Sequence, residues 1–410
     1  MYTIRIASRL KITQKGELLQ FTKLDMGLVL DYIIDTSDGQ VKAYASQKRF
    51  INDTEFDTFG EFDDHVSDIS IKDKNLIYAE TKPFKESQKR IEHDLVKKKK
   101  NKSLFKYFLD GTRHVYKVGD IAIGGVIYPL AVGQIIVGYC GREGRDIKIG
   151  KVQRTLVLAV PIQYDTKRQG AHFFRKQCEE INKKVRESLF YKKFKMEFSE
   201  IIPYGDTYDT QSEMGRNKYL RLAIAKIQNE MLDQERLLVE DMVLNDLVSN
   251  DDTMLIKDGS IEYKKDFTNR PDKNFASAKF NQNFRDVVGV SKMFDPELLS
   301  RTESHMGTII AELKPEHRTK AYRYIHEGKS YCVWYIRLRN TINRSNSYAD
   351  IIKVEMFMEG DQPKQSHVID SISAHLINEA YPVCYGKDVR WANHLYPIYV
   401  TETFCKSKLR

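Results

Sequence analysis

Residues 121–141 read IAIGGVIYPLAVGQIIVGYCG and contain no charged side chain. This stretch is long enough to span a membrane as a helix. Several glycines, Pro129 and Gln134 interrupt it, however, and β-branched residues dominate each half. Such a composition is typical of buried strands in the interior of a sheet. We therefore predict two buried strands that are joined at Tyr128 and Pro129, and no membrane span.

The composition of the whole chain is that of a soluble protein with one large core and an appended subdomain. It has 410 residues, of which 41% are hydrophobic and 30% charged. Its five cysteines are dispersed and form no C-x-x-C pair, which favours a reducing compartment and argues against a structural zinc site. The first residues lack the apolar run of a signal peptide. We expect a cytoplasmic protein.

The basic charge is clustered. The net charge is +9, and residues 151–200 hold 12 Lys and Arg against 6 Asp and Glu, a surplus of +6. A polyanion such as nucleic acid suits this surplus, and a solvated basic surface without a partner suits it equally. Arg175, Lys176, Lys192 and Lys193 alternate with aromatic residues and are the candidate nucleic-acid contacts. Their alternative role is in an amphipathic helix whose long side chains cover apolar surface.

The order of apolar patterns indicates an α/β protein. Residues 1–95 have the pattern of a small α+β leader, and residues 104–410 form the main domain. Within the main domain, strands are expected at 155–160, 254–257, 287–290, 331–338 and 351–358, and helices at 170–194, 218–248 and 368–380.

Two apolar strands are each followed by Asp-Gly and a hydroxyl residue: FLDGT at 108–112 and LIKDGS at 255–260. An aspartate at the end of a buried strand, followed by a glycine that lets the backbone turn away, presents a carboxylate where a hard cation can reach it. Asp110 and Asp258 are therefore candidate metal ligands. Asp-Gly is also a common turn dipeptide, so a plain turn is the alternative.

A third carboxylate lies in the helix expected at 218–248. Apolar residues step along one face of this helix at intervals of three or four, and Glu235 fills the slot between Met231 and Leu238. Burial of a lone carboxylate costs several kcal/mol, so Glu235 needs a cation beside it. That cation is either a metal ion or a buried Arg or Lys.

Together, Asp110, Glu235 and Asp258 make up the donor set of a phosphodiesterase centre that uses divalent metal. Carboxylates in such a centre hold Mg²⁺ or Mn²⁺, which activates water and neutralises charge on the scissile phosphate. The basic surface would hold the substrate.

At this point the chain resembles the NurA family of nucleases. The resemblance covers about three quarters of the chain, residues 104–404, and leaves out the first 95 residues. It rests on six short motifs in the family's order: FLDGTR at 108–113, MLDQERLL at 231–238, LIKDGSI at 255–261, VGVSK at 288–292, YIRL at 335–338 and LYPI at 395–398.

The resemblance implies an RNase H-like mixed sheet core flanked by helices, in a homodimer. It also implies Mn²⁺-dependent exonuclease and endonuclease activity on DNA, together with a HerA-type hexameric ATPase translocase, in DNA end processing or anti-phage defence. Asp110, Glu235 and Asp258 match the family's metal-binding carboxylates. Lys292 matches a lysine after the next strand, for which we expect contact with the substrate phosphate or the transition state; a plain surface role is the alternative. Arg113 in the first motif joins the candidate nucleic-acid contacts.

One departure from the family concerns the C-terminal segment, where the family places a histidine that completes the metal site. Residues 396–404 contain no histidine. Glu402 is the expected replacement, His394 is a second candidate, and a missing fourth ligand is the third possibility. An oxygen ligand suits Mg²⁺ and Mn²⁺ alike. If the site has decayed, the alternative function is a non-catalytic DNA-binding adaptor or clamp of the ATPase; RNA is an alternative substrate for an intact site.

Overall fold

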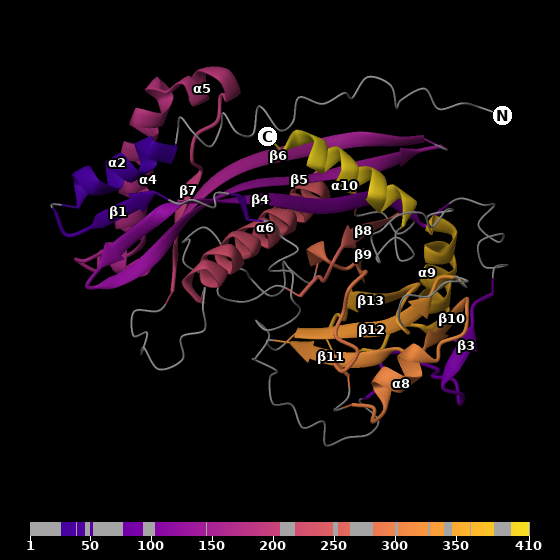
Figure 1. Ribbon diagram of the computed structural model, residues 1–410. Helices are drawn as coiled ribbons and strands as arrows, with labels where there is room; N and C mark the ends of the chain where they lie inside the picture. The colour runs from indigo at the N-terminus through magenta and orange to yellow at the C-terminus, as the bar shows by residue number, and fades with distance from the viewer. Residues whose placement is uncertain are drawn as a thin grey trace.

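The protein is described here by a computed structural model. It describes residues 26–37, 39–45, 50–51, 77–92, 103–144, 146–205, 218–248, 253–262, 282–299, 302–326, 329–339, 347–360, 362–380 and 395–409. These residues form a mixed α/β structure around one large sheet, with helices on both faces (Figure 1).

Three long strands form a meander toward one end of the sheet: β4 (Phe105–Ile123), β5 (Val126–Glu143) and β6 (Asp146–Pro161). They run antiparallel in sequence order. On the outer edge of β6 lies the parallel strand β7 (Glu200–Tyr204). On the other side of the meander, β8 (Met254–Asp258) runs parallel to β4, and β9 (Val287–Ser291) runs parallel to β8.

The sheet continues beyond β9 through antiparallel strands. Its order there is β9, β13 (Ile351–Phe357), β12 (Lys329–Arg337), β10 (His317–Thr319) and β3 (Gln88–Arg90), with β11 (Tyr322–His326) also paired to β12. The remaining helices of this half are α8 (Met306–Ala311) and α9 (Ser366–Glu379).

The first hairpin turns at Gly124 and Gly125, so the predicted turn at Tyr128 and Pro129 is wrong. The strands pair up to Ile123 and Val126, which leaves a loop of two glycines with φ of 57° and 83°. Positive φ at both positions suits the twist of a two-residue hairpin, and glycine adopts it without steric cost. Pro129 lies inside β5, where its carbonyl accepts a hydrogen bond from the Tyr204 hydroxyl at 2.5 Å.

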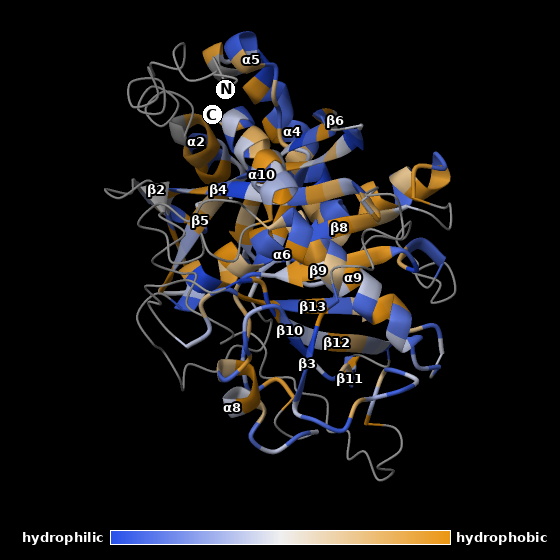
Figure 2. Cartoon of the chain, turned by 90° about the vertical axis from the view of Figure 1, so that its right-hand side faces the viewer, coloured by the Kyte–Doolittle hydropathy of each residue, from blue (hydrophilic) through white to orange (hydrophobic). Residues whose placement is uncertain are grey.

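Helices cover the two faces of the meander formed by β4, β5 and β6. α6 (Lys218–Leu244) lies on one face and α10 (Tyr396–Lys408) on the other (Figure 1). Glycines in β5 permit both contacts: a Cβ on Gly133 would lie 2.4 Å from a methyl of Ile227 in α6, and one on Gly138 would lie 3.2 Å from the sulfur of Cys405 in α10. Figure 2 shows that the helices carry both hydrophobic and hydrophilic residues, as amphipathic covers of a sheet do.

The side chains of β4 and β8 alternate between these two faces. Leu109 and Leu255 belong to the hydrophobic cluster that includes Met231 of α6. Phe108 and Ile256 belong to the cluster that includes Ile398 of α10. Because successive side chains of a strand point to opposite faces, this pattern fixes the face on which each polar neighbour lies.

The helix predicted at 170–194 is interrupted. The structure has α4 (Ala171–Glu187) and α5 (Leu189–Phe194), separated by Ser188 in an extended conformation. The Ser188 hydroxyl accepts a hydrogen bond from the backbone N–H of Tyr191 at 3.2 Å, which is how serine caps a new helix.

The described part of residues 1–95 joins the main sheet at both ends. α2 (Met26–Thr36) packs near α4, whereas β1 (Lys42–Ala45) and β2 (Phe50–Ile51) pair with β4. β3 pairs with β10 at the far end of the sheet. These strands therefore extend the sheet of the main domain, and a domain boundary at residue 95 stays a prediction.

No helix in the described ranges is long and apolar enough to cross a membrane. The uncharged stretch at 121–141 lies at the end of β4 and in β5 instead. Four of the five cysteines are described, and all four are buried and free, whereas Cys384 lies outside the described residues.

A buried ion pair anchors the segment at 77–92 to the second half of the sheet. Both Arg318 and Glu80 have fully buried side chains, and the guanidinium Nη2 lies 2.9 Å from Glu80 Oε2. Asp370 of α9 accepts from Arg318 Nε at 2.8 Å, and Lys89 approaches the same aspartate from the surface.

We expect Glu80→Gln to lower the free energy of unfolding by about 3 kcal/mol, because it removes one partner of a buried pair. Chemical denaturation measures this difference. In the control Lys89→Met, a 40% exposed side chain is removed from Asp370, and the loss should stay below about 1 kcal/mol. Equal losses in the two variants would show that burial of this pair has no energetic consequence.

Candidate metal centre

A short section of one edge of β4 defines the site. This edge pairs with β8 from Phe105 to Leu109 and with β2 and β1 only from Val115 onward. Among the described residues, therefore, no strand covers that edge at residues 110–114. The carboxyl ends of β8 and β9 meet at the same place, because both strands run parallel to β4. In α/β sheets, such a carboxyl edge is where ligands bind.

Asp110 lies at this edge but does not end its strand. The strand continues through Gly111 and Thr112 to Ile123, so the expected turn after Asp110 is wrong. Gly111 serves a different purpose: a Cβ there would lie 2.3 Å from Glu235 Oε1. Glycine thus lets α6 approach the sheet next to Asp110.

Asp258 confirms the strand-end prediction. It is the last residue of β8, and Gly259 follows with φ of 84°, a conformation that glycine adopts readily. Alternate residues of a strand share a face, so Asp258 lies on the α10 face together with Ile256. Asp110 lies on the same face, because it is two residues after Phe108.

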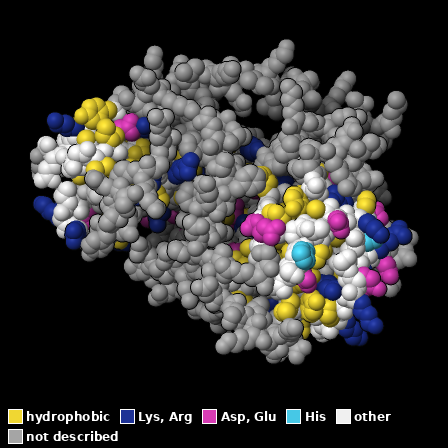
Figure 3. Space-filling model, turned by 60° about the horizontal axis from the view of Figure 1, so that its bottom comes forward, with side chains coloured by type: hydrophobic (Ala, Val, Ile, Leu, Met, Phe, Trp, Pro, Cys, Tyr) yellow, Lys and Arg dark blue, Asp and Glu magenta, His cyan; other side chains and the backbone are white. Residues whose placement is uncertain are grey.

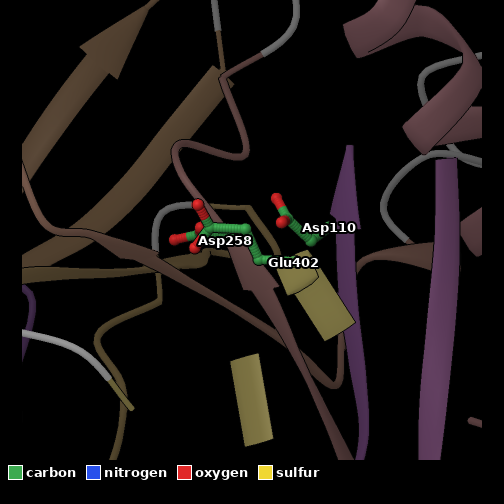
Figure 4. A group of neighbouring side chains, drawn as sticks. All are labelled: Asp110, Asp258 and Glu402. Carbon is green, nitrogen blue, oxygen red and sulfur yellow. The ribbon is translucent and has the colours of Figure 1, made fainter. Parts of the chain in front are cut away.

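Glu402 of α10 lies with the two aspartates, and its predicted role as a metal ligand stays a prediction. Figure 4 shows the three side chains converging from β4, β8 and α10. One carboxylate oxygen from each of Asp110, Asp258 and Glu402 can be chosen so that all three lie within 4.8 Å of one another. His394, the second candidate, lies outside the described residues.

Lys292 contacts two members of this group. It follows directly after β9, and its ammonium lies 2.7 Å from Asp258 Oδ2 and 3.4 Å from Glu402 Oε2. Its side chain is only 9% exposed. The sequence singled out this lysine as a phosphate contact; the structure places it among the carboxylates themselves.

Like charges at short range set the electrostatics of the site. Burial and the neighbouring Asp258 raise the pKa of Asp110 well above its usual range, and Lys292 opposes this shift. Burial disfavours the charged form of Lys292, but Asp258, Glu402 and Asp110 together raise its pKa above the usual value. Keeping all three carboxylates charged therefore calls for a cation beside them, and the Lys292 ammonium supplies one positive charge.

Glu235 is buried, as predicted, but the structure does not bring it into this group. It lies on the α6 face of the sheet, where its carboxylate pairs with Lys257 at 2.8 Å. Burial raises the pKa of Glu235, and Lys257 is the main group that lowers it. Of the two cations considered from the sequence, the structure shows the buried lysine; a role as metal ligand stays a prediction.

Lys257 is a polar residue of this region that the sequence reasoning missed. It is 1% exposed and lies in β8 on the same face as Leu255. A lysine between apolar residues of a buried strand needs a carboxylate partner, and Glu235 is the carboxylate predicted to be buried. The sequence could therefore have indicated the ion pair, because it held both a lysine in a buried strand and a glutamate predicted to be buried.

The donor set fits a hard divalent ion. Three carboxylates supply only oxygen ligands, which Mg²⁺ and Mn²⁺ prefer. None of the described cysteines or histidines belongs to the group.

A second polar cluster supports the turn after Asp258. Glu355 of β13 accepts hydrogen bonds from the Ser260 hydroxyl at 2.6 Å and from the backbone N–H of Ile261, and it pairs with Lys353 at 2.8 Å. Glu355 and Lys353 are both buried. These contacts fix the backbone that presents Asp258.

We expect Ser260→Ala to lower the free energy of unfolding by about 2 kcal/mol, because it removes the hydrogen bond that the hydroxyl donates to Glu355 and the one that it accepts from the Glu262 backbone N–H. It should also weaken Mn²⁺ binding several-fold, because the turn after Asp258 loses a contact. Calorimetric titration with MnCl₂ measures the second effect. The control Ser407→Ala removes an exposed hydroxyl bonded to Phe404 O in the last turn of α10 and should leave binding unchanged. Unchanged Mn²⁺ binding in Ser260→Ala would argue against the supporting role.

Four of the five predicted nucleic-acid contacts lie on helices apart from the carboxylates. Arg175 and Lys176 are exposed on α4, and Lys192 and Lys193 are exposed on α5. Figure 1 shows these helices beside α2, away from the part of β4 that meets β8 and α10. Arg113 is half-buried in β4 and favours the charged form of Glu235.

Figure 3 shows how the described basic side chains are distributed on one face of the molecule. The described Lys and Arg side chains on that face lie at several separate places and alternate with acidic and apolar ones. Contact of the basic residues with nucleic acid therefore stays a prediction.

Comparisons with known proteins give a limited result. No family model matches the chain, and no curated protein matches it. Among solved structures, the chain is similar to the NurA nuclease from Sulfolobus solfataricus, with a TM-score of 0.38 and 10% sequence identity over 74% of this chain and 80% of that chain.

Proposed function

We propose that this protein is a divalent-metal-dependent nuclease that hydrolyses phosphodiester bonds in DNA. The observation that carries the proposal is the convergence of Asp110, Asp258 and Glu402 at an open strand edge, with Lys292 beside them. Three buried or half-buried carboxylates serve no packing purpose, and they match the donor set of metal-dependent phosphodiesterases.

Each residue of the group has a defined task in this proposal. Asp110, Asp258 and Glu402 hold the ion, which when bound activates water and neutralises phosphate charge. Lys292 binds an oxygen of the substrate phosphate, because its ammonium is a compact charge on a flexible stem. The Ser260 and Glu355 contacts keep Asp258 in place.

The proposal includes an RNase H-like core. Its support is the arrangement of β6, β5, β4, β8 and β9, in which an antiparallel meander continues into two parallel strands with helices on both faces. The candidate ligands lie on the first strand of the meander, the first parallel strand and the C-terminal helix.

The partners are also proposals. DNA is favoured over RNA by the resemblance noted in the sequence, and the net charge of +9 suits either polyanion. A homodimer and a HerA-type hexameric ATPase that feeds DNA to the nuclease rest on that resemblance alone. Size-exclusion chromatography with a hexameric ATPase encoded nearby is the test; an elution volume unchanged by the ATPase would contradict the partnership.

The activity itself is tested with purified protein, labelled single-stranded DNA, duplex DNA and RNA, and added MnCl₂ or MgCl₂. We expect cleavage of DNA that requires the metal and stops with EDTA. Cleavage of RNA alone would reassign the substrate, and cleavage in EDTA would contradict a metal mechanism.

One observation favours a second candidate function, a non-catalytic DNA-binding adaptor of the ATPase. Lys292 supplies to Asp258 and Glu402 a positive charge that a metal would otherwise supply. A site neutralised permanently by this lysine would bind no metal. Metal-dependent degradation of DNA by the purified protein excludes this candidate.

A further inference from the structure

The position of Lys292 has a consequence for metal loading. Its ammonium contacts Asp258 and Glu402, two of the three residues proposed as ligands, and its side chain is 9% exposed. An ammonium at 2.7 Å from Asp258 Oδ2 occupies one of the lone-pair sites for which a metal would compete. A divalent ion among the same oxygens would also repel the lysine charge.

From this geometry we infer that Lys292 is a tethered counter-ion that fills the carboxylate group in the metal-free protein and leaves it when a divalent ion binds. The inference rests on the proposed function, since it requires a metal at Asp110, Asp258 and Glu402. It adds to that function an exchange in which the bound divalent ion replaces the Lys292 ammonium at the carboxylates.

The exchange is feasible in the local structure. Lys292 has a flexible side chain, and it stands at the end of β9, where Met293 is already 44% exposed. The Lys292 side chain itself is 9% exposed, so a part of it already reaches solvent. Once it has left the carboxylates, the Lys292 ammonium would remain close to a substrate phosphate bound at the metal. Metal binding would thus free this lysine for the phosphate contact proposed above.

The inference predicts an inverse relation between the charge at position 292 and metal affinity. The apparent affinity of a ligand falls with the fraction of protein in which its site is open, so a competing ammonium weakens metal binding. Lys292→Met keeps the length of the side chain and removes the charge. Lys292→Arg keeps the charge and adds a planar fork that holds carboxylates more firmly.

The test uses the full chain without DNA and titrates it with MnCl₂ in a calorimeter. We expect Lys292→Met to bind Mn²⁺ at least about tenfold more tightly than the unchanged protein, and Lys292→Arg to bind it several-fold more weakly. The control is Lys406→Met, because Lys406 pairs with Glu402 Oε1 from the surface with a 54% exposed side chain. Its affinity should stay within about threefold of the unchanged protein.

A thermal unfolding measurement gives an independent readout. In EDTA, Lys292→Met should unfold at a lower temperature than the unchanged protein, because three carboxylates then face one another without a cation. Saturating MnCl₂ should reduce or remove this difference. Should Lys292→Met fail to fold in EDTA, the order of affinities between Lys292→Arg and the unchanged protein decides the question.

The outcomes separate the two proposals. Equal or weaker Mn²⁺ binding in a folded Lys292→Met, or tighter binding in Lys292→Arg, overturns the counter-ion role while the metal site stands. Absence of Mn²⁺ binding in the unchanged protein and in both variants overturns the metal site, and with it this inference.

Discussion

Asp110→Asn is expected to lower metal-dependent cleavage of DNA by about a thousandfold. The substitution keeps the shape of the side chain and removes one of three anionic ligands. Stabilisation by a bound metal amounts to several kcal/mol, and each 1.4 kcal/mol of activation free energy changes the rate tenfold. Initial rates with labelled DNA and MnCl₂ measure the effect, and Asp258→Asn should give the same loss.

The control for this prediction is Asp241→Asn, which removes a carboxylate from the exposed part of α6 where it pairs with Lys151. Its cleavage rate should be unchanged. Asp110→Asn should also remain folded, because the buried carboxyl that it replaces lies among like charges. Full activity of folded Asp110→Asn would exclude the proposed centre.

Lys257→Met is expected to lower the free energy of unfolding by about 3–5 kcal/mol, because it leaves the Glu235 carboxylate buried without its partner. The pair lies on the α6 face with both side chains at most 3% exposed. Chemical denaturation in EDTA measures the loss. The double variant Lys257→Met with Glu235→Gln should recover much of it, since no uncompensated charge then remains.

Added metal makes the same variants informative about Glu235. If Glu235 acts only as the partner of Lys257, MnCl₂ stabilises Lys257→Met no more than it stabilises the unchanged protein. A much larger stabilisation of Lys257→Met by MnCl₂ would show that Glu235 turns to the metal once its lysine is gone. Failure of the double variant to recover stability would contradict the ion-pair account.

Much of the fold was predictable because it depends on local pattern. Strands at 254–257, 287–290 and 351–358 lie within or almost match β8, β9 and β13, and the helix at 218–248 is α6 with a slightly earlier end. The prediction failed where local signals competed. Pro129 suggested a turn, but the glycine pair before it has the backbone freedom that a two-residue hairpin needs.

The candidate site was predictable in part, for the same reason. Asp258 and Glu402 lie where the strand end and the C-terminal segment indicated. The face of the sheet on which Glu235 lies was not predictable, because it depends on which side α6 packs, and no local pattern encodes that. The partner of Glu235 was also hidden, because Lys257 meets it only after β8 and α6 pack together.

The central claim is that Asp110, Asp258 and Glu402 bind a divalent metal at the open edge of β4. The most direct measurement is anomalous diffraction at a wavelength sensitive to manganese, from crystals of the protein grown with MnCl₂. We expect an anomalous peak bounded by the carboxylates of Asp110, Asp258 and Glu402, with the Lys292 ammonium withdrawn from them. Ordered carboxylates with no peak between them, and Lys292 still in contact with Asp258, would contradict the account.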